Sequence, residues 1–154
     1  MKKFKFQLEA LLKVTKMEKE KAEVELAKIS KLLTEQQEYM EKLRQEMQQG
    51  QKDYERLTEG ARITVGTLMT YNSFFAWKRE QLQLQDEAIL QSKAQKSKRL
   101  QQLLAIRNKL ESIEQLREKR FNEFRQEQLF EEQKQLDEIG LQIYTRRVRR
   151  GEEQ

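Results

Sequence analysis

The feature that most constrains this chain is a run of apolar residues spaced alternately by three and four positions. A spacing that averages 3.5 residues places one apolar stripe along a helix and favours a left-handed coiled coil. The stripe has eighteen positions: Leu8, Leu12, Thr15, Lys19, Ala22, Leu26, Ile29, Leu33, Gln36, Met40, Leu43, Met47, Gly50, Tyr54, Leu57, Ala61, Thr64 and Leu68. Thirteen of them are apolar, and the five exceptions are Thr15, Lys19, Gln36, Gly50 and Thr64. Lys19 and Gln36 either set the helix register or are tolerated interruptions. Gly50 is either a tolerated cost of about 1 kcal/mol relative to alanine, or a soft point or place of close helix approach.

The composition agrees with long helices. Of the 154 residues, 37% are charged and 36% hydrophobic, and there is no proline. A seam between two helices needs only two apolar residues in seven, whereas a wide core needs more. We therefore predict an all-α fold, a single elongated coiled-coil domain over residues 1–154.

One stretch, Thr58 to Phe75, interrupts the helical pattern. Glycines and β-branched residues lower helix propensity there. We predict a helical hairpin, with helix one over about residues 3–58, a tip at about 58–66 and helix two over about 65–148. Gly60 is expected to end helix one in a left-handed conformation, and Thr64 to cap helix two.

Antiparallel pairing about this tip brings the two apolar stripes together. With Leu57 opposite Leu68, the predicted pairs include Tyr54 with Tyr71, Leu43 with Leu82, Gln36 with Ile89 and Leu12 with Ile113. The first arm is then exhausted near residue 121, so helix two overhangs by roughly 40 Å at about 1.5 Å per residue. The overhang still carries apolar residues at Phe124, Leu129, Phe130, Leu136, Ile139 and Ile143. A lone helix with an apolar stripe requires a partner.

The chain lacks the groups of most catalytic sites. It contains no cysteine and no histidine, so it has no thiolate nucleophile, imidazole base or metal site built on either. No glycine-rich phosphate loop occurs, and adjacent acidic residues diverge around a helix. We expect neither an enzyme nor a cofactor. The longest apolar runs are four residues, so we expect a soluble, cytoplasmic protein without membrane insertion.

Two basic clusters, residues 93–99 and 146–150, accompany the formal charge of +5. We interpret them as solvated helix faces, because neither is interleaved with aromatic residues and no groove-reading motif accompanies them. A nucleic-acid-binding coiled coil and a purely structural coiled coil remain alternative functions.

Three segments carry a resemblance to a known family. They are FKFQLEALLKVTKMEKEKAE near the start, GARITVGTLMTYNSFF at the tip and EKRFNEFRQEQLFEEQKQLDEI in the second arm. Together they resemble the FliJ family of the flagellar export apparatus. The resemblance implies an antiparallel two-helix coiled coil similar to the stalk of rotary ATPases, acting at the cytoplasmic face of the cell membrane. It also implies three partners: the export ATPase FliI, the export gate FlhA and export chaperones.

The resemblance also suggests binding residues. The surface that contacts the gate in the family matches Tyr54 and Phe74, and Tyr71 and Trp77 lie beside them. Lys78 stands where the family has an apolar residue. The free end, with Phe124, Leu129, Leu136, Ile139 and Ile143, would contact the ATPase. Packing within the hairpin is the alternative role for Tyr54, Tyr71 and Phe74.

Overall fold

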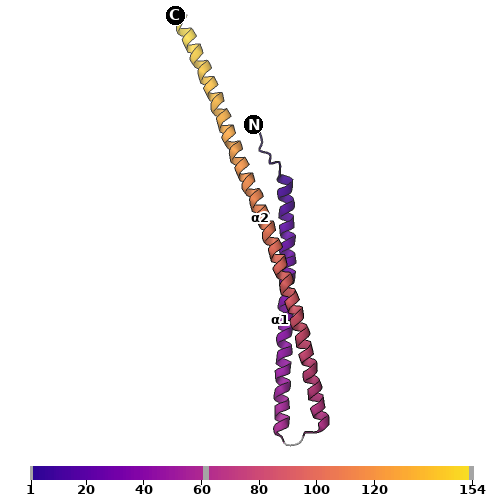
Figure 1. Cartoon of the computed structure of the whole chain (residues 1–154). Coiled ribbons are helices and arrows are strands. Elements are labelled where there is room, and N and C mark those ends of the chain that lie inside the picture. The colour runs from indigo at the N-terminus through magenta and orange to yellow at the C-terminus, as the bar shows by residue number, and fades with distance from the viewer. Residues whose placement is uncertain (1, 61–62, 153–154) are drawn as a thin grey trace. The chain divides into compact units, whose positions relative to one another are not determined.

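The computed structural model of the protein describes residues 2–60 and 63–152. They form two helices, α1 over Glu9–Glu59 and α2 over Val65–Glu152 (Figure 1). The all-α class and the antiparallel coiled-coil hairpin predicted from the stripe are confirmed. Residues 61 and 62 of the predicted tip lie outside the described residues.

The chain divides into two units. One unit is Glu18–Ile106, which contains most of α1 and the first part of α2. The other consists of Met1–Met17 and Arg107–Gln154. In each unit the two helices pack along their predicted stripes.

In the unit Glu18–Ile106 the seam is built from apolar residues of both helices. Leu33, Met40 and Ile89 form a buried cluster with Leu82 packed against it. The predicted register is confirmed near the tip, where the ring centroids of Tyr54 and Tyr71 are 5.4 Å apart. At the far end of this unit, a salt bridge of 2.8 Å joins Arg99 to Glu25.

One polar residue of this seam ties the two helices together. Gln36 is half-buried, and its main-chain carbonyl accepts a hydrogen bond of 2.9 Å from the side chain of Gln85. This bond crosses between the helices, but any residue at position 36 would supply the same carbonyl, so the side chain that ties the helices together is that of Gln85. The side-chain oxygen of Gln36 itself is buried without a hydrogen-bond partner among the described residues. Lys19 instead forms an ion pair of 3.8 Å with Glu23, one turn along its own helix.

The second unit has its own small core of Leu12, Leu110 and Ile113, with Phe6 packed against it. The prediction that helix one begins near residue 3 is wrong, because α1 begins at Glu9. Residues 2–6 are not helical. The non-helical segment allows both Phe4 and Phe6 to reach α2, whereas residues two apart in a helix point in nearly opposite directions.

Of the two predictions for the ends of the tip, the one for Thr64 is confirmed and the one for Gly60 is wrong. Thr64 caps α2 as predicted: its hydroxyl accepts a hydrogen bond of 3.2 Å from the amide of Thr67. Gly60 follows the last residue of α1, but its backbone is not left-handed, so that prediction is wrong. A Cβ on Gly60 would lie 3.7 Å from the carbonyl oxygens of Arg56 and Leu57, which is ordinary contact.

Candidate partner-binding surfaces

Close to the tip, Gly50 of α1 and Phe74 of α2 meet directly. Gly50 is buried, and a Cβ added to it would lie 2.5 Å from Cε1 of Phe74. The phenyl ring therefore occupies the space that any other residue's side chain would fill. Of the two interpretations of Gly50, close approach is the correct one, and a side chain of the partner helix makes it.

The next turn of α2 places a charged residue in the same seam. Lys78 is only 4% exposed, and its ammonium group donates a hydrogen bond to Oε2 of Glu46 on α1. This hydrogen bond is the main cause of a lowered pKa of the Glu46 carboxyl; partial desolvation opposes the shift, and the charges of Lys78 and Lys42 add to it. The lysine that departs from the family pattern is thus part of the helix–helix packing.

The predicted gate residues fall into two groups. Tyr54 and Tyr71 are half-buried and pack with Phe75, whose ring centroid lies 5.9 Å from that of Tyr54. Trp77, in contrast, is 53% exposed. Hairpin packing therefore uses both tyrosines, while Trp77 presents most of its ring to solvent.

An open groove of about 450 Å³ runs along this part of the seam. Gly50, Tyr71 and Phe74 contribute to its lining, and Lys78, Glu46 and Asp53 are also among its residues. The groove combines an aromatic surface with two carboxylates. In the sequence, the signal for this groove was a glycine in the stripe of one arm opposite an aromatic residue of the other arm.

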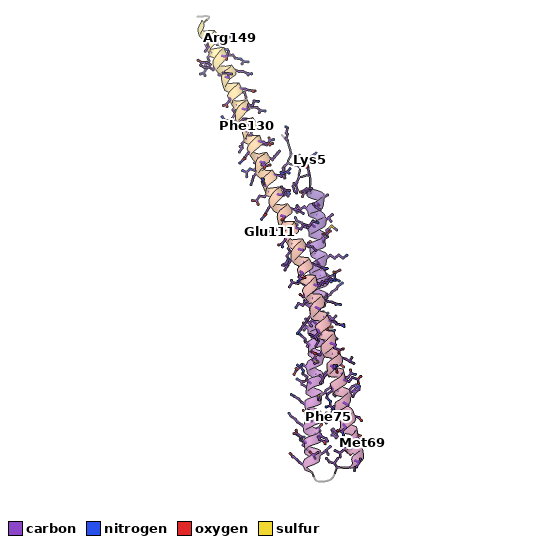
Figure 2. The ribbon with its side chains drawn as sticks, viewed as in Figure 1. Lys5, Met69, Phe75, Glu111, Phe130 and Arg149 are labelled. Atoms are coloured by element: carbon purple, nitrogen blue, oxygen red, sulfur yellow. The ribbon has the colours of Figure 1, made fainter. Side chains whose placement is uncertain are left out.

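The predicted free-end residues also divide. Phe124 is half-buried, and its ring centroid is 5.6 Å from that of Phe4. The other four are exposed: Leu129, Leu136, Ile139 and Ile143. Every side chain described from Leu129 to Gly151 is exposed. Figure 2 shows this stretch of α2, with Phe130 and Arg149 labelled, as a single ribbon with side chains on all sides.

This stretch of α2, which we call the tail (residues 127–150), carries a second apolar stripe that the sequence analysis did not separate. Its members lie on another face of the helix and are also exposed: Phe130, Leu141, Tyr144 and Val148. The spacing of three and four residues between Leu141, Tyr144 and Val148 is the signal that would have found it. The tail therefore offers two apolar faces.

The described residues lack two kinds of site: a metal-binding cluster and a membrane-spanning helix. Among them, no group of three or more acidic residues lies close enough to hold a metal ion. Nor does either helix, over its described part, contain an apolar stretch long enough to cross a membrane. The prominent surfaces of the described residues are the aromatic groove near the tip and the tail of α2.

Fold and surfaces together define a coiled-coil hairpin protein whose prominent surfaces are suited to binding other proteins. The chain belongs to the FliJ family: the family model described as "Flagellar FliJ protein" matches residues 4–149, which is nearly the whole chain. It is therefore a protein of flagellar export, and its family is a non-catalytic export component. Neither the curated proteins nor the solved structures contain a significant match.

Proposed function

We propose that this protein is a non-enzymatic coupling and escort component of flagellar export. In this role it binds the export ATPase through the tail of α2 and the export gate through the tip half, at the cytoplasmic face of the cell membrane. Membership of the FliJ family supports the process. One observation carries the assignment of the binding surfaces. The seam buries Leu33, Leu43 and Leu103, whereas four apolar residues of the tail stay exposed: Leu129, Leu136, Ile139 and Ile143.

The tail is suited to the ATPase because a helix with two apolar faces can contact more than one surrounding surface. The face of Leu136 and Ile143 lies beyond a shift of the stripe that packs on α1, and the face of Phe130 and Tyr144 lies elsewhere around the helix. Export chaperones are further candidates for these exposed faces, in keeping with the escort role of the family.

The tail can be tested without harming the fold. Leu136→Ser with Ile143→Ser replaces two exposed side chains, so the melting temperature should stay unchanged while binding to the purified ATPase falls at least about tenfold, as for central interface residues. The matched control is Leu84→Ser with Leu90→Ser, which alters two exposed leucines outside the tail. Equal binding by the tail variant and wild type would contradict the assignment.

The gate assignment depends on the groove and on Trp77. Because Trp77 is largely exposed, Trp77→Ala should weaken binding to the cytoplasmic domain of the gate without changing the unfolding temperature. Phe74→Ala is less selective, since it also removes the contact with Gly50. Met69→Ala, which alters an exposed residue nearer the tip, is the control. Gate binding that survives Trp77→Ala would restrict the site to the groove, and survival in the Phe74→Ala variant as well would refute it.

A further inference from the structure

The tail of α2 is divided into two halves of opposite charge. Residues 127–138 contain five carboxylates and one lysine, and residues 139–150 contain four arginines and no carboxylate. All the described side chains of the basic half are exposed, as are those of residues 129–138. The tail is therefore a helix with a negative first half and a positive second half, and each half faces water.

The face of the first apolar stripe carries charged residues from both halves of the tail. Continuing the spacing of three and four residues through Leu129, Leu136, Ile139 and Ile143 adds Glu132 in the acidic half, and Arg146 and Arg150 in the basic half. This face therefore has one carboxylate before its apolar centre and two arginines after it.

Gly140 follows Ile139 at the edge of this apolar face, and the chain itself does not use the space of its missing side chain. A Cβ added to Gly140 would meet nothing within 4 Å, in contrast to Gly50, whose missing side chain makes room for Phe74. Glycine inside an exposed helix costs about 1 kcal/mol relative to alanine. An absent side chain at the edge of an exposed apolar face allows a second backbone to come close.

We propose that the tail pairs in antiparallel orientation with the tail of a second copy of this chain, centred near Gly140. An antiparallel pair with twofold symmetry places each acidic half against the basic half of the other copy. Ile139 and Ile143 of both copies form the apolar centre, with the two Gly140 residues beside them. A parallel pair would place like charges together, which is unfavourable.

The predicted association is weak and sensitive to salt. Its apolar centre is small, and exposed ion pairs each contribute little and are screened by ions. The pair also covers Leu136, Ile139 and Ile143, so self-pairing and ATPase binding would exclude each other. That last consequence rests on the proposed function, whereas the self-pairing does not.

The orientation can be tested by disulfide formation, because the chain contains no cysteine. Gln133→Cys and Arg147→Cys each place one thiol seven residues from Gly140, at either side of the proposed centre. Mixed under oxidising conditions, a tagged and an untagged single-cysteine protein should form the mixed disulfide at least about tenfold faster than either forms a disulfide with itself. Disulfides that form mainly between identical variants, or at equal rates, would overturn the proposal.

The charge complementarity can be tested by sedimentation equilibrium at low salt. We expect wild-type protein to dimerise, and Arg146, Arg147, Arg149 and Arg150→Glu to weaken dimerisation about tenfold or more. A second variant replaces four carboxylates of the acidic half with lysine: Glu131, Glu132, Asp137 and Glu138. It should weaken dimerisation by as much, and mixing the two variants should restore a 1:1 complex. Circular dichroism confirms that each variant remains helical.

A control separates pairing from a general effect of charge. The control variant replaces four exposed lysines of α1 with glutamate: Lys13, Lys21, Lys28 and Lys31. It changes the net charge by as much as the arginine variant does. It should leave dimerisation within about twofold of wild type. Wild-type protein that stays monomeric up to about 1 mM, or a control that loses dimerisation equally, would overturn the proposal. If the monomeric protein nevertheless bound the ATPase, the ATPase would be the occupant of the face, and the proposed function would stand.

Discussion

Two glycines within the helices make the difference between the seam and the tail visible. Gly50 and Gly140 both lie among apolar residues inside a long helix. At Gly50 the ring of Phe74 fills the space of the missing side chain, and at Gly140 no described atom beyond the neighbouring residues and backbone of its own helix lies within 4 Å of that space. The first glycine is explained by packing within the chain, and the second is not.

The comparison shows how one sequence pattern serves two purposes. The spacing of three and four residues builds the seam where a second helix is present, so Leu43 and Leu103 are 3% and 2% exposed. From Leu129 onwards the same spacing recurs without a described partner, and Leu136 is 62% exposed. An apolar stripe therefore predicts a contact, but not whether the contact is made within the chain.

The largest expected effect comes from filling each glycine. Gly50→Leu forces the side chain against Phe74 and should lower the free energy of unfolding by about 1–3 kcal/mol through overpacking, less about 1 kcal/mol from the better helix propensity of leucine. Gly140→Leu should leave stability unchanged or raise it by up to about 1 kcal/mol. Denaturant unfolding of both variants measures the contrast. Equal effects at the two sites would erase the distinction between seam and tail.

A smaller effect is expected at the buried lysine. Glu46→Gln removes the carboxylate that Lys78 contacts, leaves the ammonium group buried without its counter-charge, and should lower the melting temperature at pH 7. Since the pKa of Glu46 is lowered in the folded state, its stabilisation is complete above the unfolded value, ordinarily about 4.5, and is lost as the pH falls through the folded value. The difference between wild type and variant should therefore shrink in acid. A difference that stays constant down to pH 2 would show that the pair contributes nothing to stability.

The cap of α2 should contribute about as much as a typical N-cap. Thr64→Ala removes the acceptor for the Thr67 amide and should cost about 1 kcal/mol. Thr64→Ser keeps the hydroxyl and serves as the control, with a change of a few tenths of a kcal/mol. If alanine and serine behaved alike in denaturant unfolding, the hydrogen bond would not be what starts α2.

The smallest effect is expected at Gly60. Its backbone is not left-handed, and a Cβ would make only ordinary contacts, so Gly60→Ala should change stability by less than about 0.5 kcal/mol. A loss above about 1 kcal/mol in thermal unfolding would show that a left-handed backbone is required there. The originally predicted role of Gly60 would then be correct.

Much of the fold followed from the sequence because its signals are local and repeated. The pairing of Tyr54 with Tyr71 required only a spacing and a turn, and Thr64 was identified by its hydroxyl ahead of a helical stretch. The start of α1 at Glu9 was missed because residues 3–8 contain no helix breaker. Residues 3–8 stay outside the helix because Phe4 and Phe6 pack on α2, and helix propensity does not include such tertiary packing.

The candidate surfaces were only partly predictable for a related reason. Periodicity identified Leu129 to Ile143 as an unpaired stripe, but it assigned Phe124 to the same surface although Phe124 packs against Phe4. It also could not decide between packing and binding for Tyr54, Tyr71 and Phe74, because aromatic residues serve both purposes. Lys78 appeared to be a defect in a binding surface, and its contact with Glu46 required the second helix to be in place.

Hydrogen–deuterium exchange of the dilute protein tests the central claim most directly. The account predicts slow exchange for the amides of α1 and α2 that flank Leu33 and Ile89, and fast exchange for the amides of residues 129–150, since helix amides without tertiary packing open locally at low cost. Adding the export ATPase should protect residues 129–150 and leave the seam unchanged. Tail amides protected as strongly as the seam in dilute protein alone would show that the chain covers its own tail, and would contradict the account.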